Sequence, residues 1–420
     1  MSHIVHPIPP VFDERSRVLV LGSMPSPASR ELGFNYGHPQ NRFWRVMARL
    51  TDEPLPDTNE RKRDFCLRHH IALWDVLAEC EIDGASDASI RNARPNDLAD
   101  IVHAAPIEAV FCTGAKAYEL YRKLGCEEAC GLPAVKLPST SPANAACSLD
   151  ALTEAYARIF EHTHEFVPPT LDVAHVVELE KAVAASGTSL AELMDRAGSA
   201  VAHRVQQVLD ERGAKGKRGA HAVGAAGTDG ADGVVGKPLV AVLCGNGNNG
   251  GDGWVAAELL AQAGVATCVI SARSPEDITA QPAHDAAMRA FSQVDSLIGP
   301  SLEELANVLE RADIVIDAMF GCGLRGGISR EPFISWVEAA NRTRAGHVTI
   351  AVDVPSGVSA DCDAGADELG SNPSAGSARN APRIVADETI TMMVPKPGLA
   401  ASECGRVRIA SLAYIEPLLS

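Results

Sequence analysis

Gly245-Asn246-Gly247-Asn248-Asn249-Gly250-Gly251-Asp252-Gly253 is the stretch that decides the fold of the later half of this 420-residue chain. An apolar segment at residues 238–244 precedes it, and residues 254–263 carry apolar side chains at helical spacing. The pattern predicts a strand, a glycine-rich loop and a helix. The glycines let the backbone approach a ligand, and open N–H groups at a helix start favour an anion such as phosphate. A bare turn would also explain the glycines, but the asparagines and Asp252 add oxygen ligands and a base.

Length and composition limit the classes of protein that this chain can belong to. A chain of 420 residues is expected to form two or three domains, and its net charge is −17. Residues 1–165 hold 17 basic and 23 acidic side chains, and the remainder holds 20 and 31, so any DNA contact must use a local patch. The eleven cysteines show no zinc spacing. Without a signal peptide or a long apolar run, a cytoplasmic protein is expected.

The first half alternates predicted strands with predicted helices. Apolar segments at residues 17–21, 71–76, 109–114 and 135–137 are the strand candidates, and helical periodicity lies between and after them. This alternation is typical of a parallel α/β sandwich. Because open sheets place their ligands at the carboxyl ends of strands, the loops after residues 21 and 137 are candidate binding loops.

Three ordered motifs in this half resemble the uracil-DNA glycosylase superfamily, and in particular its hypoxanthine (deoxyinosine) branch. They are Gly22-Ser23-Met24-Pro25, Gly37-His38-Pro39-Gln40-Asn41-Arg42-Phe43-Trp44 and Leu137-Pro138-Ser139-Thr140-Ser141-Pro142. The resemblance covers about residues 15–162, although Ser26 stands where the branch usually has glycine. It implies that a deaminated base, hypoxanthine or uracil, is flipped out of DNA and its N-glycosidic bond is hydrolysed.

The resemblance also implies roles for individual residues. Ser23 belongs to the first loop, which positions water and the scissile bond, but it cannot act as a carboxylate base. Asn41 is therefore the catalytic candidate, which orients water or contacts the base; its alternative role is an N-cap of the next helix. Phe34, Tyr36 or Phe43 would stack on the flipped base, and Ser139 and Ser141 would grip a phosphate. His38 contacts DNA or is a loop histidine bonded to backbone. Trp44 is expected in the core, and Cys126 and Cys130 are interpreted as buried thiols, so no iron–sulfur cluster is expected.

Two prolines at residues 168 and 169 break the helical pattern between the halves. We therefore expect domains at residues 1–165 and 173–420, joined by a linker at 166–172. Polar tracts at about 213–237 and 361–379 lack apolar periodicity and are expected to be disordered insertions.

In the second half, further predicted strands end in glycine-rich loops that carry acids. Residues 313–319 lead into Phe320-Gly321-Cys322-Gly323-Leu324-Arg325-Gly326-Gly327, and residues 348–352 lead into Asp353-Val354-Pro355-Ser356-Gly357. Each aspartate alone could be a turn residue. Because the carboxyl ends of parallel strands meet at one edge of a sheet, we expect these loops and the opening stretch to form one crevice in a Rossmann-like α/β/α sandwich.

These motifs, together with Leu193-Met194-Asp195-Arg196-Ala197-Gly198 and Lys396-Pro397-Gly398, resemble the NAD(P)H-hydrate epimerase family over roughly residues 173–415. The resemblance implies that the domain interconverts the R and S forms of hydrated NADH or NADPH. It implies that the substrate contacts Asn248, Asn249, Gly250, Gly251, Asp252, Gly321, Cys322, Gly323, Leu324, Arg325, Gly326, Gly327 and Asp353. It also implies that one potassium ion binds to Asn249, Asp317 and Ser356.

The hydroxyl of the hydrated ring is on a carbon next to nitrogen, so its loss and return require a proton carrier. Asp353 is the first candidate and Asp252 the second, and the residues alone do not choose between them. The alternative is that only one half is active and the other is a nucleotide- or DNA-binding module. The resemblance further implies a functional link to a separate NAD(P)HX dehydratase, and it allows a homodimer through the epimerase domain.

Overall fold

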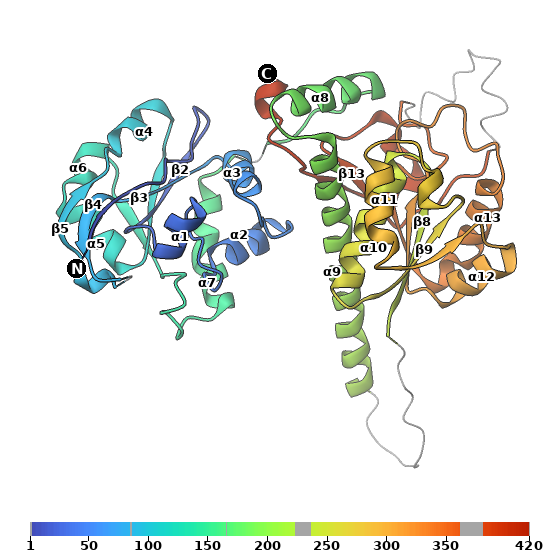
Figure 1. The fold of residues 1–420 in the computed structure, drawn as a ribbon, viewed down its shortest axis with the longest axis horizontal. Helices are drawn as coiled ribbons and strands as arrows, with labels where there is room; N and C mark the ends of the chain where they lie inside the picture. Colours follow the sequence, from blue (N-terminus) through green and yellow to red (C-terminus); the bar gives the residue numbers. More distant parts are fainter. Residues whose placement is uncertain (1, 85, 165, 223–236, 362–380, 420) are drawn as a thin grey trace, which may run out of the picture. The chain divides into compact units, whose positions relative to one another are not determined.

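The computed structural model describes residues 2–84, 86–164, 166–222, 237–361 and 381–419. The chain divides into two compact units, Met1–Val167 and Pro168–Ser420 (Figure 1). Both units are mixed α/β structures built on parallel sheets, as expected for the fold class. The tract at 213–237 was expected to lack structure, but helix α9 continues from Leu190 to Ala222. The Ala, Lys and Arg residues of this tract favour helix even without apolar periodicity. Residues 223–236, and residues 362–379 of the second expected insertion, lie outside the described residues.

The first unit contains a four-stranded parallel sheet in the order β3-β2-β6-β7. Its strands are β2 (Val18–Gly22), β3 (Ile71–Asp75), β6 (Ala109–Thr113) and β7 (Ala134–Leu137). Its helices are α1 (Pro27–Leu32), α2 (Phe43–Thr51), α3 (Asn59–Arg68), α4 (Ala99–Ala104), α5 (Ala115–Lys123), α6 (Cys126–Cys130) and α7 (Leu149–Tyr156). The strand β2 is buried along its whole length, which agrees with its continuous apolar sequence.

A second sheet in this unit was not expected from the sequence. It is antiparallel, with the order β1-β4-β5, and its strands are β1 (Ser2–Val5), β4 (Leu77–Ile82) and β5 (Arg91–Pro95). The strand β4 begins two residues after β3 ends, so residues 71–76 and 77–82 look like one apolar segment in the sequence. The extra sheet brings the N-terminal segment next to the end of β3.

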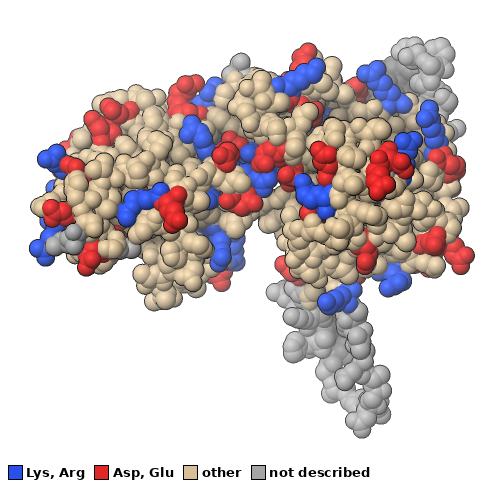
Figure 2. Space-filling view, viewed as in Figure 1, with Lys and Arg blue, Asp and Glu red and all other residues tan. Residues whose placement is uncertain are grey.

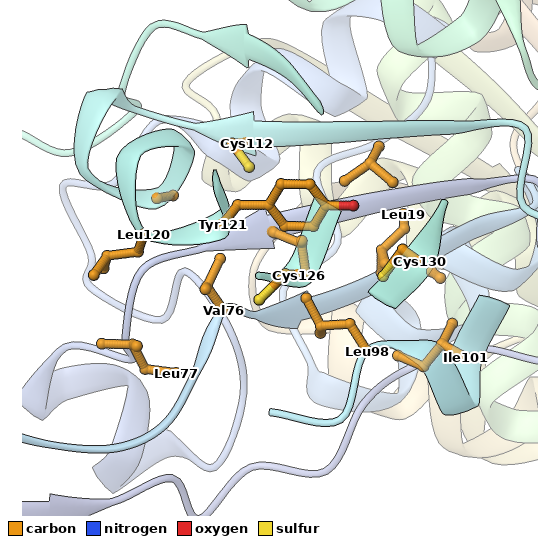
Figure 3. Packing of buried hydrophobic residues seen from close by; sticks show 14 of the residues in the cluster. Leu19, Val76, Leu77, Leu98, Ile101, Cys112, Leu120, Tyr121, Cys126 and Cys130 are labelled. Carbon is orange, nitrogen blue, oxygen red and sulfur yellow. The ribbon is translucent and has the colours of Figure 1, made fainter. Parts of the chain in front are cut away.

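An apolar cluster beside the parallel sheet contains several cysteine thiols (Figure 3). Cys126 and Cys130 lie among Leu98, Ile101 and Tyr121. Both thiols are buried, and burial raises the pKa of Cys126 to about 11. Buried, protonated thiols behave as small apolar side chains, so these two residues contribute to packing.

The second unit is a seven-stranded parallel sheet in the order β10-β9-β8-β11-β12-β13-β14. Its strands are β8 (Leu239–Cys244), β9 (Ala266–Ser271), β10 (Asp295–Ile298), β11 (Ile314–Ala318), β12 (Val348–Val352), β13 (Glu388–Met392) and β14 (Arg406–Ala410). Its helices are α8 (Val173–Ala185), α9 (Leu190–Ala222), α10 (Asn248–Gln262), α11 (Ala283–Phe291), α12 (Leu302–Arg311) and α13 (Phe333–Thr343).

The order of the strands places the topological switch point between β8 and β11. The chain runs outward from β8 through β9 to β10, and then returns to place β11 on the other side of β8. Open α/β sheets bind ligands at such a switch point, outside the carboxyl ends of the strands. Helices α12 and α13 cover one face through a cluster around Leu305, Leu309 and Trp336, and α10 lies on the other, where Gly253 packs against Val242 and Ala318. The loop after β8 and the loop after β11 therefore line the same edge.

Candidate functional site

Glycines bring the loop after β8 into contact with the loop after β11. A Cβ atom on Gly245 would lie 1.8 Å from the Met319 carbonyl oxygen, and one on Gly250 would lie 2.0 Å from the Gly245 oxygen. No other residue fits these positions without moving backbone. Helix α10 then begins at Asn248 with Gly247 as N-cap and no side-chain capping bond. Its first N–H groups are therefore open to an anionic ligand.

Side chains from two different elements meet over Gly321, in the loop after β11. A Cβ atom on Gly321 would lie 2.9 Å from Asn249 Oδ1 and 3.1 Å from Asp353 Oδ2. Asn249 comes from the first turn of α10, and Asp353 follows β12. The structure thus brings the sequence-predicted residues 249, 321 and 353 to one place. The amide Nδ2 of Asn249 is buried and has no hydrogen-bond partner among the described residues.

Asp317 and Ser356 form a buried pair beside this loop. Both residues are 0% exposed. Asp317 accepts hydrogen bonds from the Ser356 N–H (2.7 Å), the Ser356 hydroxyl (2.6 Å) and the Met319 N–H (3.3 Å). The Phe320 N–H donates to Ser356 Oγ at 2.9 Å, which ties the pair to the residue before Gly321.

Asp317 is a buried carboxylate whose pKa is raised. Burial raises the pKa of Asp317 to about 6, even though the bonds from Ser356 and Met319 act to lower it. Within the described part of the chain, no basic side chain pairs with this carboxylate. Carboxylate, hydroxyl and amide oxygens are ligands for hard cations. Asp317, Ser356 and Asn249 carry oxygens of these kinds, although no group of three or more His, Cys, Asp or Glu side chains with metal-site geometry occurs among the described residues.

Asp353 is held as an ion by a buried lysine. The Lys396 ammonium donates to Asp353 Oδ1 at 2.5 Å, and the two side chains are 1% and 8% exposed. The Cys322 N–H donates to the other oxygen, Oδ2, at 3.1 Å. Burial acts to raise the pKa of Asp353, but the charge and hydrogen bond of Lys396 lower it below the ordinary value. The backbone of Asp353 has φ = 66°, a left-handed conformation that non-glycine residues adopt at functional sites.

The nearby Asp252 has the opposite electrostatic environment. Burial raises its pKa well above the ordinary value, and the negative charges of Asp353 and Glu180 raise it further. Glu180 is on α8, and its own pKa is also raised by burial and by Asp353. Sequence reasoning assigned no role to Glu180 or Lys396. Lys396 lies between two prolines in the Lys-Pro-Gly motif, and this pattern could have identified it as a site residue. Glu180 is one of several acids on its helix, so nothing in the sequence distinguishes it.

In the first unit, Arg42 joins two loops that are far apart in the sequence. Its guanidinium donates to the carbonyl oxygens of Ser141 (3.2 Å), Asn144 (2.8 Å) and Cys147. Its N–H donates to the Thr140 oxygen at 3.1 Å. The loop before α2 and the loop after β7, which carry two of the glycosylase-like motifs, therefore lie side by side.

Asn41 and His38 each make a local backbone contact. Asn41 Oδ1 accepts the N–H of Phe43, the first residue of α2, at 2.9 Å, whereas the N-cap position is Arg42 and has no side-chain capping bond. This bond leaves the amide Nδ2 of the half-buried side chain for another role. His38 Nδ1 accepts the Gln40 N–H at 3.1 Å, as expected for a loop histidine bonded to backbone.

The aromatic candidates differ in exposure. Phe34 is 8% exposed and packs against Trp44, whose indole N–H donates to the Asn35 oxygen, so both side chains belong to the core. Tyr36 and Phe43 stack on each other with ring centroids 4.0 Å apart, and Phe43 is 0% exposed. Of the three candidates for stacking on a base, only Tyr36 keeps appreciable exposed surface.

The two predicted serines of the loop after β7 shape that loop. Ser139 Oγ accepts the Ser141 N–H at 3.2 Å, and Ser141 Oγ accepts the Ala143 N–H at 3.3 Å. The Asn144 side-chain amide donates to the Ser139 carbonyl oxygen at 2.8 Å. These bonds form a compact turn, and each serine hydroxyl keeps its own hydrogen as a donor.

Carboxylates that the motifs did not reveal lie beside Ser23. The Ser23 hydroxyl donates to Asp87 Oδ1 at 2.9 Å, and burial raises the pKa of Asp87. Asp75 ends β3 opposite Gly22, and it pairs with His6 at 2.9 Å. The sequence offered no signal for these two contacts, because Asp87, Asp75 and His6 all lie outside the three motifs.

Comparisons with known proteins match each unit to a different family. Residues 9–161 match the model of the uracil DNA glycosylase superfamily, and residues 190–398 match that of the YjeF-related protein N-terminus. The chain is 34% identical over 159 residues to a hypoxanthine DNA glycosylase of Methanosarcina acetivorans, which is 37% of this chain and 96% of that protein. It is 33% identical over 187 residues to an NAD(P)H-hydrate epimerase of Pirellula staleyi, which is 43% of this chain and 75% of that protein.

The chain belongs to both families. It is a fusion of a glycosylase-family unit and an epimerase-family unit. The epimerase-family unit is also 36% identical over 178 residues to the bifunctional NAD(P)H-hydrate repair enzyme Nnr of Hyperthermus butylicus, of which the chain spans 30%. Figure 2 shows basic and acidic side chains interspersed over both units on the face in view. Within the described residues, no helix has the length and apolar character needed to span a membrane.

The buried ion pair of the epimerase-family unit generates a stability prediction. Lys396→Met leaves Asp353 buried without its counter-charge, so urea unfolding at neutral pH should show a loss of about 3–5 kcal/mol. The wild-type contribution of the pair should be lost as pH falls through the folded-state pKa of Asp353, because that pKa is below the ordinary value. The double variant Asp353→Asn/Lys396→Met is the control and should be less destabilised than Lys396→Met. Equal or greater destabilisation of the double variant would show that the lysine does not act through Asp353.

Proposed function

We propose that the epimerase-family unit interconverts the R and S forms of hydrated NADH or NADPH at the edge between β8 and β11. The observation that supports this most strongly is the pair of carboxyl groups, Asp252 and Asp353, whose pKa values are shifted in opposite directions. Such a pair separates a proton donor from a permanent anion. The proposal assigns the proton to Asp252, the second sequence candidate, and the negative charge to Asp353.

The reaction then needs one reversible proton transfer. The Asp252 carboxyl donates its proton to the ring hydroxyl, the C–O bond breaks to release water, and the lone pair of the ring nitrogen forms a C=N bond. Water adds to the other face of the ring and returns its proton to the Asp252 carboxylate. Asp353 Oδ2, which accepts one hydrogen bond, from Cys322, can accept another from the substrate and oppose the positive charge of the intermediate.

The remaining predicted residues are assigned to binding. We propose that a phosphate of the dinucleotide lies at the open N-terminus of α10, next to Asn248, Gly250 and Gly251. The loop from Gly321 to Gly327 would hold the hydrated ring of the substrate, because Gly321 lies against Asp353 and the Cys322 N–H donates to Asp353. Glu180 keeps the proton on Asp252 by adding negative charge beside it.

The first prediction from this function concerns Asp252. Asp252→Asn keeps the shape of the side chain but cannot transfer a proton, so the epimerisation rate should fall at least about 100-fold, the scale of general acid–base catalysis. In the wild type the rate should fall as pH rises through the raised pKa of Asp252, because the protonated form is the donor. The assay follows loss of the R epimer in the presence of an S-specific dehydratase.

Asp295→Asn, on the edge strand β10, is the matched control and should retain normal turnover. An Asp252→Asn variant with unchanged turnover would remove Asp252 as the proton carrier. In that case Asp353→Asn tests the remaining candidate in the same assay.

We also propose that Asn249, Asp317 and Ser356 hold one potassium ion, which would supply positive charge beside the buried Asp317 carboxylate. Replacing potassium by choline at constant ionic strength should lower the melting temperature of the protein and its epimerisation rate. Asp317→Asn should abolish both responses. Equal melting temperatures of the wild type in the two salts would rule out this site.

For the glycosylase-family unit, we propose hydrolysis of the N-glycosidic bond of a deaminated base in DNA. The supporting observation is that Arg42, the neighbour of Asn41, joins two of the three family motifs, while Ser23 of the third motif is bonded to Asp87. Tyr36 is the stacking candidate, and the hydroxyls of Ser139 and Ser141 are the phosphate donors. In this proposal the amide Nδ2 of Asn41 contacts water or the base.

Two substitutions separate the backbone contact that Asn41 makes through Oδ1 from the proposed role of its amide Nδ2. Asp at this position can still accept the Phe43 N–H, but it cannot donate as Nδ2 does. We expect both Asn41→Ala and Asn41→Asp to lose at least about tenfold in excision of hypoxanthine from a duplex, while epimerase activity of the same chain serves as the internal control. Full excision by Asn41→Asp would show that Asn41 acts only through this backbone contact.

We place both activities in the cytoplasm, because all ten described cysteines are unpaired, as is typical of a reducing compartment. The substrates are then hydrated NADH or NADPH for one unit and damaged DNA for the other. The S-specific dehydratase that consumes one epimer would be a separate protein. The chain would form a homodimer through its epimerase-family unit.

A further inference from the structure

A carboxylate from the connection between β4 and β5 is bonded to the first loop of the glycosylase-family unit. Ser23, in this loop, cannot act as a base, but its hydroxyl donates to Asp87 Oδ1 at 2.9 Å. Asp87 opens a short 3-10 helix, Asp87–Ser89, that lies between the two strands. The fold therefore brings a carboxylate to a loop whose own residues, 22–27, include none.

Backbone hydrogen bonds join the start of β4 to the same loop. The Val76 N–H donates to the Gly22 oxygen at 2.9 Å. Leu77, the first residue of β4, donates its N–H to the Ser23 oxygen at 3.2 Å. Because Asp87 follows the far end of β4, the connection between β4 and β5 turns back toward Ser23 to bring the carboxylate there.

The hydroxyl of Ser89 braces this connection. Ser89 Oγ accepts the Asp83 N–H at 2.8 Å and donates to the Ser86 oxygen at 2.7 Å. The Ser89 N–H donates to the same Ser86 oxygen at 2.8 Å. These bonds tie together the residues on both sides of Asp87, so its carboxylate is carried by a braced backbone.

One oxygen of the Asp87 carboxylate is bonded and the other is open. Oδ1 accepts from Ser23, and Oδ2 accepts from no residue that the structure describes. The side chain keeps exposed surface, so water can reach it. The protein around it still desolvates the carboxyl and raises its pKa, and the charge of Asp75 adds to this effect. The Ser23 hydrogen bond and the charge of Lys116, on α5, oppose the rise.

The neighbouring side chains are less suited to take a proton from water. Asn41 carries a neutral amide, which is not a base. Asp75 is buried, and its Oδ2 accepts from His6 at 2.9 Å. Burial also raises the pKa of the Tyr36 phenol well above its ordinary value, so this group stays protonated. Asp87 is thus the carboxylate beside the motifs that combines solvent contact with an open oxygen.

We propose that Asp87 is a catalytic residue of the glycosylase-family unit, whose Oδ2 accepts a proton from the water that attacks the sugar. Ser23 is its positioning residue, because the Ser23 hydroxyl holds Oδ1. This inference rests on the proposed glycosylase function and adds the group that activates water.

The step is a hydrolysis with one proton transfer at Asp87. The N-glycosidic bond breaks with its electron pair going to the base, which leaves positive charge on the sugar. The water oxygen bonds to C1′ while one of its protons moves to Asp87 Oδ2. The carboxyl then releases this proton to solvent, and the departing base takes up one proton from solvent. While it is ionised, Asp87 also opposes the positive charge on the sugar.

Asp87→Asn tests this role because an amide oxygen can still accept from Ser23, whereas the side chain cannot take up a proton. We expect excision of hypoxanthine from a duplex by the full-length chain to fall at least about 100-fold, the scale of general acid–base catalysis. Asp83→Asn removes the same charge from an exposed position of the same connection, so it is the matched control and should retain wild-type excision. Normal excision by Asp87→Asn would overturn the inference and leave the glycosylase function standing.

Two further readouts separate a proton carrier from a structural residue. Asp87→Ala leaves space for a small carboxylate, so sodium formate should raise its excision rate at least about tenfold over sodium chloride of equal ionic strength. In the wild type the rate should rise with pH through the raised pKa of Asp87, because the ionised carboxylate is the base, and Asp87→Asn should lack this rise. The ionisable groups that face Asp87, namely Asp75 on β3, Lys116 on α5 and Cys80 on β4, are unchanged between the two proteins. No effect of formate together with a wild-type pH profile in Asp87→Asn would assign Asp87 a structural role.

Binding shows whether the variant is folded. A duplex whose hypoxanthine nucleotide carries a 2′-fluoro sugar resists cleavage, and Asp87→Asn should bind it at least as tightly as the wild type, because a negative charge is removed near DNA phosphates. Binding at least about tenfold weaker would contradict the inference, since Asp87 would then act by holding the loop. A wild type that cleaves no deaminated base would overturn the glycosylase function, and this inference with it.

Discussion

The epimerase-family unit depends on one buried ion pair, in which Lys396 holds Asp353 as an ion. An isolated carboxylate among buried residues would take up a proton, since desolvation disfavours its charge. The ammonium at 2.5 Å and the backbone N–H groups around it prevent this. The resulting negative charge then acts on its surroundings and adds to the effect of burial in raising the pKa of Asp252. Two chemically identical side chains therefore have pKa values that are shifted in opposite directions.

Glycines make this arrangement possible by removing side chains where loops must touch. Gly245, Gly250 and Gly321 each have a neighbour within 3 Å of the place where a Cβ would be. Without them, the loops after β8, β11 and β12 could not converge on Asp353. The glycosylase-family unit uses the same device at Gly22, where the Asp75 carboxylate takes the space of a side chain. In both units, therefore, a buried carboxylate lies against the backbone of a glycine at the end of parallel strands.

The two units differ in how their buried carboxylate is stabilised. Asp353 has a positive charge beside it, whereas Asp75 has a neutral histidine that donates a single hydrogen bond. A full counter-charge suits a group that opposes a developing positive charge, because it keeps the carboxylate ionised throughout. A neutral donor leaves more of the carboxylate charge available to neighbouring groups, such as Tyr36 and Asp87, whose pKa values the charge of Asp75 raises.

The sequence by itself determined the fold class, the two families and the loops that carry the motifs, because strand and helix periodicity and glycine-rich strand ends are local patterns. It also indicated Asp353 and Asp252 as the two candidate proton carriers of the epimerase-family unit. Only the tertiary structure distinguished them, because a pKa depends on neighbours such as Lys396 and Glu180, which lie 43 residues after and 173 residues before Asp353 in the printed sequence. The antiparallel sheet of β1, β4 and β5 was missed because β4 begins almost where β3 ends. That sheet carries the N-terminal segment to Asp75, and a contact between residues 6 and 75 exists only once the chain has folded.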